Sequence, residues 1–336
     1  QSVALASGVA ITQAPSDKPP EALFAQAKEE LAFGDFIAAR KTLVQLIAKH
    51  PENAQARVLL GRVMIDQGQV QSGLDELEAA EPYVTSGQRL RLWSLKGEAM
   101  MRLTRLEEAV RLYQAVIKHS PDDFAAQANL GNIYRMLGQF KKSENTFKRL
   151  VKRDRHRIGS FSNYVSSLHY DPSKNQQDIF KLLAQWDKYY APKVVRRQQS
   201  RDKDPARRLR IGLVSAGLHS HPVGQMIVQA LENAPSQEVE WVAYRTKAVE
   251  DRVSQRLKAC CSQWHNVMAL SDEELDARVR QDDIDILIDL CGHSEGYRLG
   301  AMAREPAPLI IKWVGGLINT TGPSAIDYLI SDAVET

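Results

Sequence analysis

The sequence predicts two architectures in series: a solenoid of paired helices in the first half and a layered α/β domain in the second. The first prediction rests on small residues that recur at a nearly constant spacing. The second rests on short apolar runs that alternate with helical stretches from Leu209 onward. A chain of 336 residues has room for two or three domains, and its 43% hydrophobic and 25% charged residues are ordinary for a globular protein.

A repeat of about 34 residues runs through the first half, which is the period of the tetratricopeptide repeat, a pair of antiparallel helices. Three sets of equivalent positions, called columns here, recur with this period: two of small residues and one of large residues. Pro51 and Pro121 end the second helix of their repeats. The first small column is Ala27, Gly61, Gly97 and Gly131, at spacings of 34, 36 and 34 residues; the second is Ala39, Gly73, Ala109 and Ser143; the large column is Leu43, Leu77, Tyr113 and Phe147.

This pattern is typical of close helix packing, because Gly or Ala lets two helices touch while a large residue fills the gap to the next repeat. We therefore expect an N-terminal segment at 1–19 and tetratricopeptide repeats over 20–157. Residues 158–192 keep helical spacing but lose the consensus. They predict a degenerate repeat or cap, which the end of a solenoid requires.

A solenoid presents a concave surface to an extended partner and has no chemistry of its own. Asn129, Asn132 and Asn163 are candidates for holding a peptide backbone, as Asn does on the inner face of related solenoids. Solvated surface residues are the alternative interpretation. The predicted partner of the repeats is an acceptor protein or peptide on the concave face.

The bulk properties exclude several classes of protein. A net charge of +3 is too small to indicate nucleic acid, and no apolar run approaches the ~20 residues of a membrane span. Cys260, Cys261 and Cys291 fit neither a disulfide framework nor a zinc site, so a cytoplasmic setting is expected. The basic stretch 193–208 is either a solvated linker or a patch for anionic ligands or a membrane surface.

The second half predicts strands that alternate with helices, and therefore βαβ units with a mostly parallel sheet. In such sheets ligands bind outside the carboxyl ends of the strands. The expected strands are 209–216, 238–244, 284–290, 309–314 and 328–330, and the expected helices are 223–231, 249–259, 272–280 and 298–304.

Three loops follow these strands. Residues 217–224 carry His219 and His221 before a predicted helix, where a His can take a proton and the helix N-terminus favours an anion. The loops 291–296 and 315–322 are Gly-rich, yet neither has a dinucleotide or P-loop signature, which argues against NAD and ATP. Asp283 and Asp285 are spaced like a metal-binding Asp-x-Asp but lie at the amino end of a strand, so no metal site is expected.

The blocks LRIGLVSAGLHSHPVG (209–224) and IDILIDLCGHSEGYRLGAMAREPAPLIIKWVGGLINTTGPSAIDYLISDAVET (284–336) resemble the catalytic region of the repeat-linked O-GlcNAc transferase family and its plant relative, the SPINDLY O-fucosyltransferase. The resemblance covers about residues 23–336. It implies a two-lobed GT-B fold, of which 209–336 would be the Rossmann-like N-terminal lobe. It also implies metal-independent, inverting transfer of a sugar, most simply GlcNAc from UDP-GlcNAc, to Ser or Thr of cytoplasmic proteins.

The resemblance also implies site residues. His221 matches the family's His before Pro and would face the sugar and the acceptor as candidate general base. The loop at 314–322 is one residue longer than in many relatives, which weakens the match at 316–319. The substrate-binding residues implied by the match are Pro222, His293, Gly315, Thr320, Thr321 and Gly322.

Two alternatives stay open at this point. The chain starts with Gln1 and stops before the second lobe, so it is expected to be a piece of a longer enzyme that is inactive alone. A repeat scaffold with an inactive α/β lobe is therefore the first alternative. A transferase that uses GDP-fucose is the second, because the missing lobe would select the donor.

Overall fold

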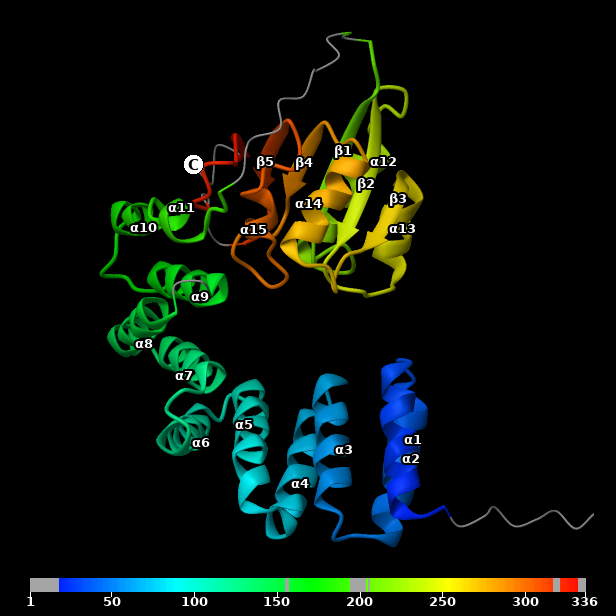
Figure 1. Cartoon of the computed structure of the whole chain (residues 1–336), viewed down its shortest axis with the longest axis vertical. Coiled ribbons are helices and arrows are strands. Elements are labelled where there is room, and N and C mark those ends of the chain that lie inside the picture. Colours follow the sequence, from blue (N-terminus) through cyan, green and yellow to red (C-terminus); the bar gives the residue numbers. More distant parts are fainter. Residues whose placement is uncertain (1–17, 155–156, 194–203, 205, 317–320, 332–336) are drawn as a thin grey trace, which may run out of the picture. The chain divides into compact units, whose positions relative to one another are not determined.

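The computed structural model describes residues 18–154, 157–193, 204, 206–316 and 321–331 (Figure 1). The chain divides into two compact units, one ending at Ile133 and the other starting at Tyr134. Most of the predicted linker 193–208 and Thr320 lie outside the described residues. In the described part of the chain, no helix is both long and apolar enough to cross a membrane.

The first unit is built of helix pairs, which confirms the predicted helical repeats. All three repeating columns are buried, so each helix turns its periodic face inward. The helices are α1 (Pro20–Ala32), α2 (Phe36–Lys49), α3 (Ala54–Asp66), α4 (Val70–Ala80), the 3₁₀ turn η1 (Glu81–Tyr83), α5 (Ser86–Arg102) and α6 (Leu106–His119), and α7 (Phe124–Met136) spans the boundary between the units.

The small columns allow direct contact between helices of a pair. A Cβ atom on Gly61 would lie 2.7 Å from the carbonyl oxygen of Gly73, and one on Gly73 would lie 2.6 Å from that of Gly61. The backbones of α3 and α4 therefore touch. At Gly97 a Cβ atom would lie 2.8 Å from the ring of Tyr113, so α5 and α6 meet through an aromatic side chain.

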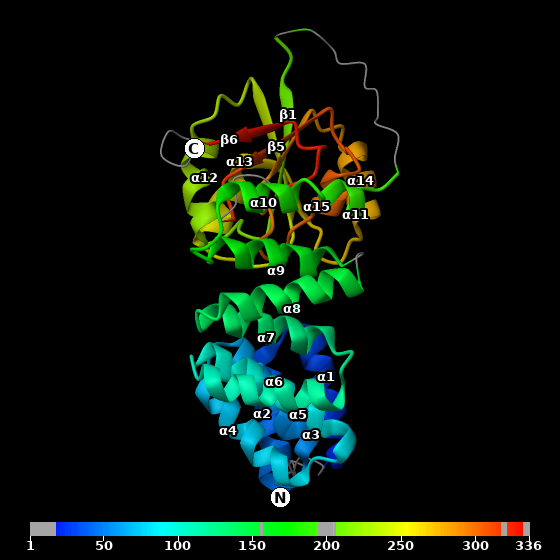
Figure 2. The same cartoon turned by 90° about the vertical axis from the view of Figure 1, so that its left-hand side faces the viewer.

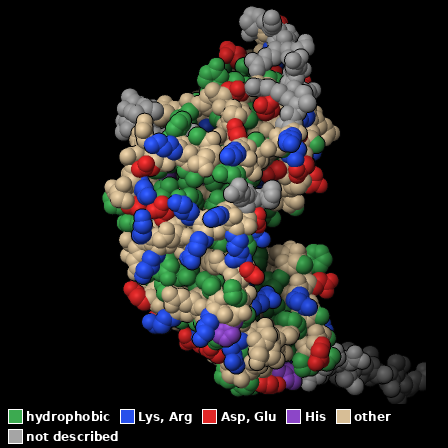
Figure 3. Space-filling view, turned by 60° about the vertical axis from the view of Figure 1, so that its left-hand side comes forward, with side chains coloured by type: hydrophobic (Ala, Val, Ile, Leu, Met, Phe, Trp, Pro, Cys, Tyr) green, Lys and Arg blue, Asp and Glu red, His purple; other side chains and the backbone are tan. Residues whose placement is uncertain are grey.

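The second unit begins with helices α8 (Phe140–Arg153), α9 (Ile158–His169), α10 (Gln176–Leu183) and α11 (Trp186–Tyr190). Helix α8 buries Phe147 and Leu150 and turns basic side chains outward (Figure 3). Helix α11 is attached to the α/β part, because Asp187 accepts hydrogen bonds from the amide of Ser324 at 3.1 and 3.2 Å. The boundary between units thus falls inside the predicted repeat array, because the last helices pack with the sheet.

The α/β part has one parallel sheet in the order β3-β2-β1-β4-β5-β6, as the alternating pattern predicted. One strand, β3, was not predicted. Its sequence Cys-Ser-Gln-Trp-His-Asn is mostly polar and follows helix α13 (Arg252–Cys260) without any turn residue. The strands are β1 (Leu209–Ser215), β2 (Val239–Arg245), β3 (Cys261–Asn266), β4 (Ile286–Asp289), β5 (Leu309–Trp313) and β6 (Tyr328–Ile330).

Helices cover both faces of this sheet, as Figure 2 shows. On one face α12 (Pro222–Glu232) and α13 (Arg252–Cys260) bury Ile227 and Leu257 against β1 and β2. On the other, α14 (Asp272–Gln281) and α15 (Leu299–Met302) bury Leu275 and Met302. The sheet is therefore sandwiched, and its strand ends are the surfaces left open to a ligand.

Candidate active site

A cavity of about 420 Å³ opens at the carboxyl ends of the central strands. Strand β1 has β2 on one side and β4 on the other, so the loops that leave β1 and β4 diverge to opposite faces of the sheet. Ligands of open α/β sheets bind at such a point of divergence. Side chains from both loops line the cavity, including His221 after β1 and Ser294 after β4.

His221 is the residue before helix α12 and caps its N-terminus. Its Nδ1 accepts a hydrogen bond from the amide of Val223 at 3.3 Å, and Pro222 occupies the first turn, where no amide donor is needed. The side chain is exposed to the cavity. A neutral ring whose Nδ1 accepts carries its proton on Nε2. In this conformation His221 therefore offers a donor, and it can accept a proton only when it releases the amide of Val223.

His219 lies beside His221, with the two ring centroids 5.7 Å apart. Partial burial lowers the pKa of His219 and outweighs the opposing carboxylate of Asp251, whose Oδ2 lies 3.8 Å from Nδ1. Asp251 also accepts a hydrogen bond from the amide of Ser220 at 2.7 Å and caps helix α13. The loop after β1 is thus attached to the start of α13.

A buried lysine borders the cavity from β5. Lys312 is 3% exposed, and its ammonium donates to the carbonyl oxygens of Val314 and Gly315 in the following loop. Its strand partner in the register is Asp289 of β4, which is fully buried and accepts hydrogen bonds from the amides of Cys291 and Gly292, each at 2.9 Å. Burial raises the pKa of Asp289, against the effect of the Lys312 charge. Asp289 thus holds the loop after β4, and Lys312 holds the loop after β5, at the rim of the cavity.

The loop after β5 has an unusual backbone. Val314, Gly315 and Gly316 all have positive φ angles, of 38°, 69° and 81°. A Cβ atom on Gly315 would lie 1.9 Å from the carbonyl oxygen of Leu290, so only glycine fits there. The loop therefore lies against the end of β4, and its carbonyl oxygens face Lys312.

Cys291 is a poor candidate for a nucleophile. It lines the cavity, but burial raises the pKa of its thiol to about 11. A thiol of this kind stays protonated near neutral pH, and the thiolate is the reactive form.

His293 occupies a different place from His221. Its ring is buried, Nε2 lies 2.8 Å from the carbonyl oxygen of Thr321, and Nδ1 lies 2.8 Å from Oγ of Ser162 on α9. A carbonyl only accepts, so Nε2 carries the proton and Nδ1 accepts from the serine hydroxyl. Burial lowers the pKa of His293 to about 4. The neutral imidazole therefore connects a cap helix to two loops beside the cavity.

The structure brings only some of the predicted site residues together. His221, Pro222 and Gly315 line the cavity. His293 and Thr321 are buried behind it, and a Cβ on Gly322 would meet the carbonyl oxygen of Leu183 at 2.8 Å. Sequence reasoning missed Lys312, although a lysine inside an apolar strand is itself a signal. Substrate contacts of all these residues remain predictions.

The predicted peptide-binding asparagines are half-buried rather than exposed. The amide of Asn129 donates to the Tyr113 hydroxyl at 3.0 Å, which ties α7 to α6. Asn132 lies on α7 and Asn163 on α9. Their role toward a peptide remains a prediction.

Asp285, half of the Asp-x-Asp considered above, binds Arg207 through both carboxylate oxygens, at 2.7 and 2.8 Å. It also accepts from the amide of Arg210 at 2.9 Å, at the amino end of β4 and away from the cavity. Within the described residues, no group of three or more His, Cys, Asp or Glu side chains is arranged to hold a metal ion.

Comparison with known proteins adds to this geometry. Residues 191–336 match the family model described as Glycosyl transferase family 41, and residues 30–97 and 100–160 match a tetratricopeptide repeat model. The chain is 32% identical over 136 residues to a protein of Arabidopsis thaliana named probable UDP-N-acetylglucosamine–peptide N-acetylglucosaminyltransferase SPINDLY. It is 32% identical over 130 residues to the UDP-N-acetylglucosamine–peptide N-acetylglucosaminyltransferase of Caenorhabditis elegans.

These alignments cover 39% and 38% of this chain but only 15% and 11% of the relatives. A solved structure of a mutant Thermobaculum terrenum O-GlcNAc transferase is similar over 93% of this chain and 53% of its own, with a TM-score of 0.65 and 30% identity. The chain thus spans about half of that structure and a smaller part of the curated relatives.

The fold and the cavity define a class: a helical-repeat protein joined to a doubly wound parallel α/β domain with a ligand cavity at the point where its strand order diverges. Within that class, residues 191–336 match the model of glycosyl transferase family 41, and the residues before them match a tetratricopeptide repeat model.

Proposed function

We propose that the natural protein is a glycosyltransferase that moves GlcNAc from UDP-GlcNAc to Ser or Thr hydroxyls of proteins. The observation that carries this proposal is the position of His221, at the start of α12 in the cavity beside β1 and β4, within a region that matches glycosyl transferase family 41. The names of the relatives support the donor and the peptide acceptor.

The transfer is a single displacement at the anomeric carbon. The acceptor oxygen forms a bond to that carbon, the bond to the diphosphate breaks with inversion, and the hydroxyl proton passes to a base. His221 is the described side chain best placed to take that proton, once its Nδ1 leaves the amide of Val223. The freed N-terminus of α12 and the nearby Lys312 charge supply positive potential for the diphosphate.

We propose further that the reaction needs no metal ion and takes place in the cytoplasm. Potential from the helix end and from Lys312 can replace that of a cation at the diphosphate. Cys260, Cys261 and Cys291 are free thiols, as a reducing compartment favours. Transfer by the natural protein should therefore persist in 5 mM EDTA at about the untreated rate; full loss of activity, restored by Mg²⁺ or Mn²⁺, would contradict this.

The repeats would recruit the acceptor protein. Their match to a tetratricopeptide repeat model and their regular helix pairs support this role. Asn129, Asn132 and Asn163 are the proposed contacts to the acceptor backbone.

Isothermal titration of UDP, UDP-GlcNAc and GDP-fucose into the longest natural form of the protein tests the proposal. The expected result is micromolar binding of the uridine nucleotides, with sugar transfer lost in His221→Ala but nucleotide binding retained. Binding of GDP-fucose alone would change the donor to fucose. Binding of none of the three would leave a repeat scaffold with an inactive α/β lobe.

A further inference from the structure

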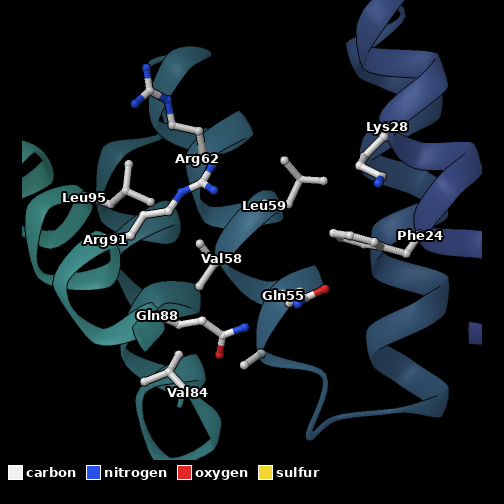
Figure 4. Close-up of a pocket in the computed structure, with 11 residues that line it drawn as sticks. Phe24, Lys28, Gln55, Val58, Leu59, Arg62, Val84, Gln88, Arg91 and Leu95 are labelled. Atoms are coloured by element: carbon white, nitrogen blue, oxygen red, sulfur yellow. The ribbon is translucent and has the colours of Figure 1, made fainter. Parts of the chain in front are cut away.

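A second cavity, of about 320 Å³, lies in the repeat unit and is separate from the site described above. It is formed by the first helices of three successive repeats: α1, α3 and α5. Figure 4 shows Phe24 pointing from α1 toward Leu59 of α3, and Arg91 reaching from α5 toward α3. Its volume is at the lower end of the range for ligand pockets.

The floor of this cavity is apolar. Phe24 and Leu59 are partly buried and pack on the core of the first repeats, and Val58 and Leu95 continue the apolar surface toward α5. A floor of this kind gains free energy when it covers an apolar side chain, at about 25 cal/mol per Å² of surface removed from water. It favours a ligand with at least one large apolar group.

The charged residues of the lining have one sign. Lys28, Arg62 and Arg91 are lining residues, and no Asp or Glu is among them. Arg62 already pairs with Asp66 at 2.8 Å and Glu98 at 3.2 Å. In the described part of the chain, Lys28 and Arg91 pair with no carboxylate. Two cations on opposite walls, above an apolar floor, are therefore available to an acidic ligand.

The lining also includes Gln55 and Gln88, one from α3 and one from α5. A glutamine amide offers two donors and an acceptor, which matches the alternating groups of an extended peptide backbone. The cavity thus combines groups suited to a backbone, to carboxylates and to an apolar side chain.

We propose that this cavity binds an extended segment of a partner protein in which a large apolar side chain is flanked by carboxylates. The apolar side chain covers Phe24 and Leu59, and the flanking carboxylates pair with Lys28 and Arg91. The inference deepens the proposed recruiting role of the repeats and rests on it, because it states which partner sequences the repeats select.

Fluorescence anisotropy of the whole chain with three labelled peptides tests this. The probe peptide is Gly-Ser-Glu-Leu-Glu-Glu-Gly-Ser; one matched peptide has Gln for every Glu, and the other has Ser for Leu. The probe should bind with a micromolar Kd, weaken as NaCl is raised from 50 to 300 mM, and exceed both matched peptides in affinity by about tenfold or more.

Charge reversal on the protein distinguishes binding in this cavity from a non-specific attraction of the acidic peptide to surface cations. Arg91→Glu should weaken binding of the probe by about tenfold or more, because it places like charges together. Arg89→Glu is the matched control, since Arg89 is exposed on the same helix but does not line the cavity. It should leave the affinity within about twofold. Thermal melts of both variants should match the wild type.

Three outcomes would overturn the proposal: equal binding of the probe and its Gln counterpart, equal losses in Arg91→Glu and Arg89→Glu, or no binding of the probe at about 1 mM protein. Sedimentation velocity adds a fourth, a dimer lost in Arg91→Glu, because the occupant would then be a second copy of this chain. His221→Ala should bind the probe like the wild type, so failure of the glycosyltransferase proposal does not affect this result.

Discussion

His293 holds three segments together only in its neutral form, which makes it a source of pH-dependent stability. Its pKa is lowered to about 4 in the folded chain, against about 6.5 when unfolded. Between these values the unfolded chain binds the extra proton, so the stabilisation is complete above pH 6.5 and is lost as the pH falls toward 4.

We expect the free energy of unfolding to fall by about 2 kcal/mol more in the wild type than in His293→Gln between pH 7.5 and pH 5. The comparison cancels the other titrating groups. Urea unfolding curves at the two pH values measure the difference. Equal losses in both proteins would show that His293 does not titrate as the structure indicates.

Lys312 and Asp289 form a second residue-scale test. Removing the lysine leaves a buried carboxyl without its compensating charge, so Lys312→Met should lower the free energy of unfolding by about 3 kcal/mol or more. The double variant Asp289→Asn/Lys312→Met should recover part of this loss. Lys247→Met, which removes an exposed partner of Glu295, should change stability by less than about 1 kcal/mol.

If the stability losses of Lys312→Met and Asp289→Asn simply added up in the double variant, the two charges would not interact. Lys312 also shows why sequence reasoning falls short at this scale. Its place in an apolar strand was visible in the sequence, but its partner Asp289 becomes its neighbour only in the register of β4 and β5.

At the scale of elements, the contact between α3 and α4 predicts a strong asymmetry between glycines. Gly61→Ala places a methyl group against a backbone oxygen that cannot turn away, so the helices must separate, at a cost of about 1–3 kcal/mol. Gly87→Ala, on α5, meets no atom within 4 Å and should change stability by about 0.5 kcal/mol or less. Thermal unfolding followed by circular dichroism measures both. Equal effects would contradict the close packing.

Elements were predictable where a period ran through them. The repeat helices follow from three columns in one phase, and five of the six strands in the described residues follow from apolar runs. Strand β3 has no such run, because its residues are mostly polar and it pairs with β2 at an edge of the sheet. Its formation depends on pairing with β2, which the local sequence pattern does not predict.

At the scale of the whole molecule, the order of the two architectures and the side of the sheet that carries the cavity could be predicted. Which of the predicted site residues line the cavity, and which are buried beside it, could not be predicted. His221 follows β1 directly, so its place is set by local sequence. His293 lies 131 positions from its partner Ser162, and no local sequence pattern predicts a contact at that separation.

The boundary between compact units is another whole-molecule property without a local signal. Repeat phase predicts repeats as far as residue 157, and the division into compact units falls inside that array, after residue 133. The difference arises because α9 and α11 form hydrogen bonds with the loops of the sheet.

The hydrogen bonds of His293 have a mechanical consequence. One imidazole connects α9, a helix of the predicted cap, to Thr321 in the Gly-rich loop that follows β5. A displacement of α9 is therefore passed to the backbone beside the cavity through two directional hydrogen bonds, one between Ser162 and His293 and one between His293 and Thr321. The connection depends on the neutral imidazole, because a proton on Nδ1 would end its acceptance of the Ser162 hydrogen bond and detach α9 from the loop.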